Sequence, residues 1–161
     1  MRILIYLSYL LLLVSFSVQA EKHNQNLRTI DGESVSINDY AGDGRWLLVM
    51  LWATDCSICS KEMPGMSDFH RRHVNADAQV LGVALDGYEN RNEVKTFMAR
   101  HELSFPSVIA EMPSFALQYE AEVGEPLIGT PTYLLFNPGG ELVANNPGPL
   151  RPVAVEQFMR R

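Results

Sequence analysis

The feature that most constrains the fold is a buried-strand pattern that leads into a pair of cysteines. Residues 46–52 form a continuous apolar run, bounded by a Gly-Asp-Gly turn at 42–44 and by polar residues. A run of this length without alternation is typical of a central strand buried on both faces. Cys56 and Cys59 follow closely, at the start of a helix predicted over residues 56–73. This order of strand, turn, cysteine pair and helix predicts an α/β unit with the cysteines at a helix N-terminus.

A position at a helix start gives the two cysteines unequal chemistry. The free N–H groups and the dipole of a helix N-terminus stabilise negative charge, which lowers the pKa of a thiol there from about 8.5. We therefore expect Cys56 to be the nucleophile. Cys59, one turn further along the same face, is expected to resolve the mixed disulfide that Cys56 forms. Because a disulfide across so short a loop restrains little of the unfolded chain, the pair is better suited to redox chemistry than to stabilising the fold.

Two core cysteines or a structural zinc site are the alternatives for this pair. Structural zinc needs four ligands, and the chain has two cysteines and four histidines, which are scattered along the sequence. His70 and His73 are expected on a solvated face at the end of the dithiol helix, where positive charge compensates the helix dipole. The sequence thus favours redox chemistry with no metal, and with no cofactor beyond the disulfide itself.

The first twenty residues predict export. They begin with one basic residue, Arg2, continue as an apolar run and end with small residues before Ala20, which is the pattern of a signal peptide over residues 1–20. An uncleaved membrane anchor is the alternative, although the run is shorter than the roughly 20 residues that comfortably span a bilayer. We expect residues 21–26 to form a flexible leader and residues 27–161 to form one domain.

The charge balance excludes one class of partner. The whole chain has 13 Lys and Arg residues against 19 Asp and Glu residues, and loss of residues 1–20 removes only Arg2 from this balance, which gives a formal net charge of −7. Nucleic-acid binding needs a basic face for the phosphates. We therefore predict no nucleic-acid partner.

The remaining sequence predicts alternating strands and helices. Asp31-Gly32 is a hairpin turn signal, and a second turn signal lies at residues 137–140. The other expected strands cover 27–30, 34–37, 79–85, 107–109, 132–136 and 141–144, and the other helices cover 92–101, 114–120 and 153–161. This order, with a hairpin near the C-terminus, indicates one α/β domain.

The segment around the cysteines resembles a known family. Residues 52–64 read WATDCSICSKEMP and are similar to the WATWCxxCxxExP signature of TlpA/ResA-like periplasmic thioredoxins. Further blocks of that family are matched in the same order by residues 31–37, 97–106, 129–133 and 137–140. The resemblance implies a thioredoxin-like fold and a periplasmic location. The fold would have a central mixed sheet flanked by helices, an N-terminal β-hairpin and a TlpA-type insertion.

The resemblance also assigns residues around the dithiol. It implies that Glu62 takes the proton of the buried Cys59 thiol and that its charge raises the thiol pKa values. Pro131 matches the cis-proline that presents the backbone of Thr130 to an extended substrate segment. Trp52, at the start of the signature, is counted with them as a substrate-binding residue. The residues alone leave open a surface role for Glu62 and an ordinary trans Pro131.

The sequence departs from the family pattern at positions that tune the dithiol. Asp55 replaces the usual Trp before the first cysteine, and it is expected either to cap the helix or to oppose ionisation of Cys56. Ser57-Ile58 lacks the proline common between the cysteines of reductants. Met50 stands where thioredoxins bury an acid, so proton handling is expected to depend more on Glu62. These departures leave the direction of the redox reaction open.

Three functions fit these residues. The first is a reductase of disulfides in exported client proteins, for which the family implies apocytochromes in cytochrome c maturation or copper-centre assembly proteins as clients, and a membrane thiol donor of the DsbD/CcdA type. The second is a Cu(I) metallochaperone, with Cys56, Cys59, Met63 and Met66 as soft ligands, although the methionines are more simply core residues. The third is an oxidant that forms disulfides. The chain is expected to be a monomer.

Overall fold

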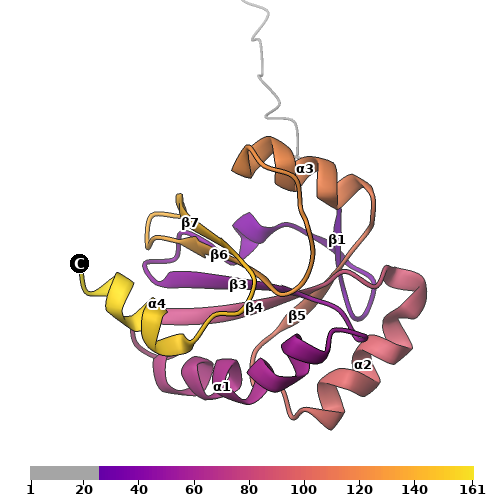
Figure 1. The fold of residues 1–161 in the computed structure, drawn as a ribbon, viewed down its shortest axis with the longest axis horizontal. Helices are drawn as coiled ribbons and strands as arrows, with labels where there is room; N and C mark the ends of the chain where they lie inside the picture. Colours follow the sequence, from indigo (N-terminus) through magenta and orange to yellow (C-terminus); the bar gives the residue numbers. More distant parts are fainter. Residues whose placement is uncertain (1–25) are drawn as a thin grey trace, which may run out of the picture.

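The apolar run at residues 46–52 forms the central strand of a seven-stranded mixed sheet in the computed structural model, which describes residues 26–161 (Figure 1). This strand, β3 (Trp46–Trp52), is buried at every residue except its first. It pairs in parallel with β4 (Ala78–Ala84) and antiparallel with β6 (Thr132–Phe136). Because helices cover both faces of the sheet, the central strand needs apolar side chains on both sides, which explains why the run does not alternate.

The edges of the sheet are made by two hairpins. The remaining strands are β1 (Leu27–Thr29), β2 (Ser34–Val35), β5 (Ser107–Ala110) and β7 (Leu142–Pro147). The sheet order is β2-β1-β5-β4-β3-β6-β7, so the β1–β2 and β6–β7 hairpins lie at opposite edges. The predicted N-terminal hairpin and the predicted C-terminal hairpin are therefore both confirmed.

Helices cover the two faces unequally (Figure 1). The helices are α1 (Ser57–His73), α2 (Arg91–Arg100), α3 (Ser114–Val123) and α4 (Pro152–Met159), with short 3-10 turns at Ile37–Asp39 and Tyr88–Asn90. Residues of α1, α2 and α4 share one core cluster, which includes Phe69, Val94 and Val155. Residues of α3 belong to the second cluster, on the other side, with Phe115 and Tyr119. The predicted central mixed sheet flanked by helices is thus confirmed.

The extra unit expected from the family resemblance is α2 together with β5. It follows β4 in the chain, and β5 enters the sheet between β1 and β4. In consequence α2 lies on the same face as the dithiol helix α1, and its Phe97 stacks on Trp52 with ring centroids 4.8 Å apart. The insertion therefore packs directly beneath the loop that precedes the cysteines.

Two local predictions are wrong. His70 does not lie on a solvated face: it is only 7% exposed, and its Nδ1 accepts a hydrogen bond from the Val80 N–H over 3.1 Å. Ile37, expected in a strand, begins a 3-10 turn instead. By contrast His73 is only partly buried, and its ring nitrogens form hydrogen bonds with Asp77 and Glu156.

The predicted signal peptide and all of the predicted leader except Asn26 lie outside the described residues. Asn26 itself is tied to the domain, because its backbone C=O accepts a hydrogen bond from the Glu111 N–H and its side chain donates to Gln118. Within residues 26–161, no helix is both long enough and apolar enough to cross a bilayer.

Candidate active site

The two cysteines lie at the N-terminal end of α1 and are joined by a disulfide, with their Cα atoms 5.2 Å apart. Their environments differ. Cys56 is partly exposed, whereas Cys59 is completely buried in the core cluster beneath α1. The sulfur of Cys56 caps the helix by accepting a hydrogen bond from the Cys59 N–H over 3.1 Å. This geometry suits an accessible sulfur whose negative charge is stabilised by a helix N-terminus, with a second sulfur behind it.

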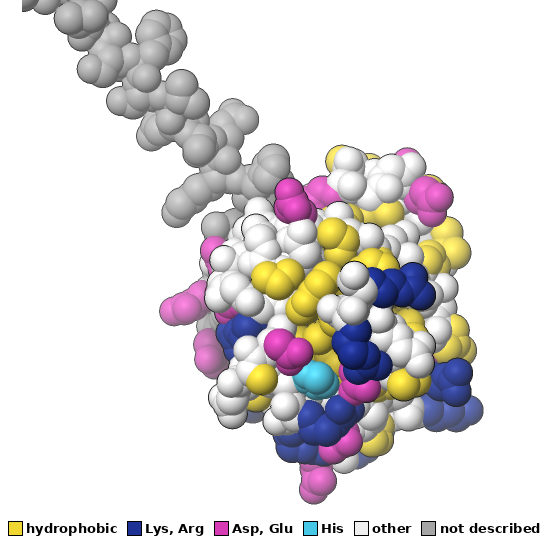
Figure 2. All heavy atoms as spheres, turned by 90° about the vertical axis from the view of Figure 1, so that its left-hand side faces the viewer, with side chains coloured by type: hydrophobic (Ala, Val, Ile, Leu, Met, Phe, Trp, Pro, Cys, Tyr) yellow, Lys and Arg dark blue, Asp and Glu magenta, His cyan; other side chains and the backbone are white. Residues whose placement is uncertain are grey.

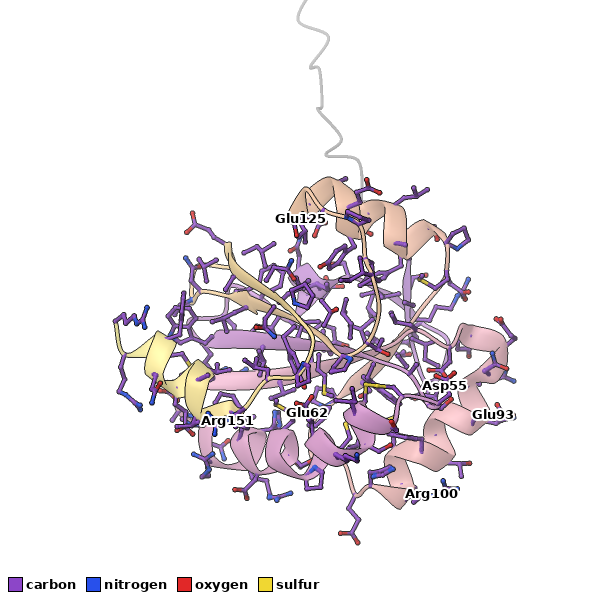
Figure 3. The ribbon with its side chains drawn as sticks, in the orientation of Figure 1. Asp55, Glu62, Glu93, Arg100, Glu125 and Arg151 are labelled. Carbon is purple, nitrogen blue, oxygen red and sulfur yellow. A yellow bond between two sulfur atoms is a disulfide. The ribbon has the colours of Figure 1, made fainter. Side chains whose placement is uncertain are left out.

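One of the two roles predicted for Asp55 was to cap the helix, and that prediction is wrong. The cap is Cys56, and the side chain of Asp55 is exposed just beyond the N-terminus of α1 (Figure 3). Ser57 and Ile58 are also exposed, and 42% of Ile58 is accessible. The side chain of Asp55 and the dipeptide between the cysteines therefore lie on the solvent side of the dithiol.

A carboxylate that the sequence reasoning missed anchors the loop before Cys56. The N–H of Thr54 donates to Asp86 Oδ1 over 3.1 Å, and the Thr54 hydroxyl donates to the same oxygen. The other oxygen, Oδ2, is buried and has no partner among residues 26–161. Asp86 follows β4 just as Thr54 follows β3. The carboxyl ends of adjacent parallel strands meet at one edge of a sheet, and that rule is the signal that could have paired them.

Pro131 is preceded by a cis peptide bond, as the family resemblance implied; Met112–Pro113 is also cis, which was not predicted. The register pairs Leu51, near the end of β3, with Thr132 at the start of β6. The dithiol loop and Pro131 therefore extend from the same end of the sheet. Pro131 is buried, and its C=O accepts a hydrogen bond from the Gly148 N–H over 2.8 Å.

The backbone of Thr130 borders an open pocket. In the described part of the chain, neither its N–H nor its C=O makes a backbone hydrogen bond. The pocket has a volume of about 250 Å³ and is lined by Ile128, Gly129, Thr130, Pro131, Thr132, Pro147 and Gly148. Ile128 is 78% exposed. A free backbone edge beside an apolar side chain is the arrangement that an added β-strand requires.

Trp52 differs from the other predicted substrate-binding residues, because no part of its side chain reaches the surface. It is completely buried and stacked on Phe97, and its Nε1 has no hydrogen-bond partner within residues 26–161. The structure therefore gives Trp52 no surface with which to touch a substrate directly. Trp52 instead packs in the core, directly before the loop that leads to the cysteines.

Glu62 is held by donors from two other parts of the chain. Its Oε2 accepts a hydrogen bond from the Tyr133 hydroxyl over 2.7 Å, and its Oε1 accepts one from the Leu150 N–H over 2.9 Å. Figure 3 shows Glu62 on α1, the helix that carries the dithiol. Burial, and next the hydrogen bond to Glu62 and its charge, raise the pKa of Tyr133 far above its ordinary value. Tyr133 therefore keeps its proton at neutral pH and can donate it in a hydrogen bond to Glu62.

The donors to Glu62 border a hollow between α4 and the β6–β7 hairpin. Its volume is about 220 Å³, and its lining includes Tyr133, Leu135, Leu150, Val155 and Phe158. Figure 2, which faces this side of the molecule, shows hydrophobic side chains gathered in the middle with charged side chains around them. The Tyr133–Glu62 pair thus lies beside a hollow that opens to solvent.

The residues considered for Cu(I) binding do not form an open ligand set. Met63 and Met66 are completely buried and pack in the core cluster, which confirms the simpler prediction of core residues. Between residues 26 and 161 no group of three or more His, Cys, Asp or Glu side chains is arranged to hold a metal ion.

Comparisons with a family model and with known proteins find relatives that are thiol-disulfide oxidoreductases. The model of the AhpC/TSA family matches residues 16–145. The thiol-disulfide oxidoreductase ResA of Halalkalibacterium halodurans is 31% identical over 133 residues, which cover 83% of this chain and 70% of the relative. Sporulation thiol-disulfide oxidoreductase A of Bacillus subtilis is 27% identical, over 82% of this chain and 75% of the relative.

A solved structure shows the same fold. The thioredoxin domain of a thiol-disulfide oxidoreductase from Bacteroides vulgatus superposes with a TM-score of 0.66 at 26% identity, covering 82% of this chain and 90% of that one. The site brings together a dithiol at a helix N-terminus, a carboxylate on the same helix and a cis-proline at the same end of the sheet. The chain therefore belongs to the AhpC/TSA family and is a TlpA/ResA-like thiol-disulfide oxidoreductase with a thioredoxin-like fold.

Proposed function

We propose that the protein is a periplasmic reductase of disulfides in exported client proteins, with Cys56 as the attacking sulfur. The observation that carries this proposal is the asymmetry of the dithiol. Cys56 is partly exposed at the N-terminus of α1, and Cys59 is completely buried behind it. Only the outer sulfur is accessible to a protein-sized substrate, and that sulfur has the stabilised negative charge that nucleophilic attack needs.

The proposed reaction has two steps. In the first, the Cys56 thiolate attacks one sulfur of the client disulfide, so that a mixed disulfide forms and the other client sulfur leaves as a thiolate. In the second, Cys59 gives its proton to Glu62, attacks Cys56 and closes the Cys56–Cys59 disulfide, while the second client thiolate leaves. Two electrons pass from the dithiol to the client, and the client thiolates take up protons from water.

The pocket beside Pro131 is proposed to bind the client segment that carries the disulfide. The unpaired N–H and C=O of Thr130 would pair with that segment as with an added strand. Ile58 and Ile128 would contact apolar side chains of the client, because both are exposed near this end of the sheet. Recognition through the backbone would allow clients of different sequence to bind.

The geometry of the site does not decide where the protein works, in which direction it exchanges disulfides or with which partners. These parts of the proposal come from the sequence and the relatives. The apolar segment at residues 1–20 supports a periplasmic location. The resemblance of residues 52–64 to the TlpA/ResA-like signature supports reduction, with a membrane thiol donor of the DsbD/CcdA type to restore the dithiol. Proteins of cytochrome c maturation or of copper-centre assembly are the proposed clients.

Trapping tests the proposal with two matched variants. Cys59→Ser cannot resolve the mixed disulfide, so it should accumulate covalent complexes with exported proteins that dithiothreitol releases. Cys56→Ser retains a single buried sulfur and should trap none. The reduced wild-type protein should reduce the disulfides of insulin with one disulfide lost per dithiol oxidised. Complexes that form with Cys56→Ser but not with Cys59→Ser would contradict the assignment of the attacking sulfur.

A further inference from the structure

Tyr133 connects the substrate-facing strand β6 to the dithiol helix through one side chain. It lies two residues after Pro131 and is 1% exposed. Its hydroxyl reaches Glu62 Oε2, while the Leu150 N–H occupies the other oxygen of the same carboxylate. Both oxygens of Glu62 are thus held by neutral donors that come from different parts of the chain.

No charged side chain pairs with Glu62 in the part of the chain that the structure describes. Within these residues Arg151, which follows Leu150, likewise pairs with no carboxylate. On the sheet, Tyr133 lies opposite Met50, which is completely buried and apolar. The central strand therefore contributes no polar side chain at this position.

Glu62 and Tyr133 are both placed near Cys59, the first by helix spacing and the second by the core cluster. Glu62 lies three residues after Cys59, and side chains at this spacing are neighbours on a helix. Tyr133 and Cys59 belong to the same core cluster. The carboxylate is therefore the common neighbour of the tyrosine hydroxyl and of the sulfur that must lose a proton.

We propose that Tyr133 is a positioning residue of the exchange reaction: its hydroxyl fixes the Glu62 carboxylate and keeps it ionised, ready to accept the Cys59 proton. This inference rests on the proposed role of Glu62. Loss of one hydrogen bond to the charged form disfavours that form, so a variant without the hydroxyl should protonate the carboxylate at a higher pH than the wild type does. A protonated Glu62 cannot accept the Cys59 proton.

The two steps of the reaction can be separated with 5,5′-dithiobis(2-nitrobenzoate). Attack by Cys56 releases one thionitrobenzoate, and attack by Cys59 on the resulting mixed disulfide releases a second, so rapid mixing gives two phases of absorbance. The first phase reports Cys56 and serves as an internal reference. The pH dependence of the second phase reports the group that accepts the Cys59 proton.

Tyr133→Phe keeps the buried ring and removes only the hydroxyl. Its second phase should lose rate as pH falls, with a midpoint about one to two pH units above that of the wild type. Tyr119→Phe is the matched control, because Tyr119 is similarly buried and its hydroxyl donates to Asn145, not to Glu62. The control should keep the wild-type midpoint. An equal midpoint in Tyr133→Phe and Tyr119→Phe overturns the inference.

Glu62→Gln separates this inference from the function on which it rests. In the Glu62→Gln background, Tyr133→Phe should produce no further shift of the second phase, because the titrating group is gone. A full shift in that background would overturn the inference, since Tyr133 would then act through another group. A second phase that is the same in Glu62→Gln and in the wild type overturns the role of Glu62, whereas the absence of both phases in the wild type overturns the proposed function itself.

Discussion

Thr54 and Asp86 tie the loop before the dithiol to the end of the neighbouring strand, since the amide and the hydroxyl of Thr54 both donate to one oxygen of Asp86. Cys56 follows two residues later, and its own N–H donates to the C=O of Ala53. The position of the attacking sulfur is therefore fixed both by its helix and by a hydrogen-bonded turn. The Asn90 side chain fixes Asp86 in turn, by donating to its backbone C=O over 2.6 Å.

Thr54→Val removes the hydroxyl donor while keeping the size of the side chain. Asp86 is a charged acceptor, so we expect the variant to lose roughly 1.5–3 kcal/mol of unfolding free energy in urea. Thr96→Val is the control, because the Thr96 hydroxyl donates only to the backbone C=O of Asn92 on α2. We also expect Cys56 of Thr54→Val to be alkylated by iodoacetamide at an altered rate. Equal stability losses in the two variants would show that Asp86 does not hold the loop.

Asp55→Asn removes a negative charge beside Cys56 without disturbing the helix cap, which is Cys56 itself. The pKa of the Cys56 thiol should fall, because the nearby charge no longer opposes ionisation. Asp55 is exposed, so solvent screening limits the change to roughly half a unit or less. Titration of the thiolate absorbance of the reduced protein measures this pKa, and an unchanged or higher value would contradict the predicted role of Asp55.

His70 makes the stability of the fold sensitive to pH. Burial, with smaller contributions from the charges of Arg45 and Arg71, lowers the pKa of this imidazole. In the unfolded chain the pKa returns to about 6.5. Below that pH the unfolded state binds more protons than the folded state, so this contribution to stability is complete above about pH 6.5 and declines as the pH falls through the window between the two values.

Urea unfolding at several pH values measures this effect. We expect His70→Gln to lose less unfolding free energy than the wild type between about pH 7 and pH 5, because one titrating group is gone. His101→Gln controls for the loss of a partly exposed imidazole stacked on Phe97. A His70→Gln profile with the same slope as the wild type would assign the pH dependence to other groups.

Gly82 on β4 allows Trp52 and Ser107 to approach the strand. A Cβ atom at Gly82 would overlap Ser107 Oγ and would lie 2.8 Å from Trp52 Nε1. We expect Gly82→Ala to cost about 3 kcal/mol of stability or more. Gly65→Ala, in a solvent-exposed position of α1 where the nearest atom is 3.7 Å away, should be neutral or stabilising by up to about 1 kcal/mol. Thermal unfolding of the two variants compares them, and similar midpoints would refute the steric account.

The strands were predictable wherever apolar runs had clear ends. The bounds of β3 and β6 match the predicted ranges, because polar turn residues limit both runs. The strand β7 extends three residues further than predicted, through Pro147. This strand forms a sheet edge, where a missing N–H costs little, so the proline does not end it.

The site was predictable where chemistry depends on sequence spacing, as for Cys56 and Cys59. The partners of Glu62 and Thr54 were not, because they come from distant segments. Tyr133 has the pattern of a core strand residue whether or not its hydroxyl has a partner. The burial of His70, by contrast, could have been predicted. It lies four residues after the buried Met66, and residues at this spacing lie on the same face of a helix.

The reduction potential of the Cys56–Cys59 pair tests the central claim most directly. The protein is equilibrated in a series of dithiothreitol or glutathione buffers, and the fraction of free thiol is measured by alkylation. A reductase should have a potential near or below the roughly −270 mV of thioredoxin, so that electrons flow from the dithiol to client disulfides. A potential near about −120 mV would contradict the account, because the same dithiol would then form disulfides in its clients.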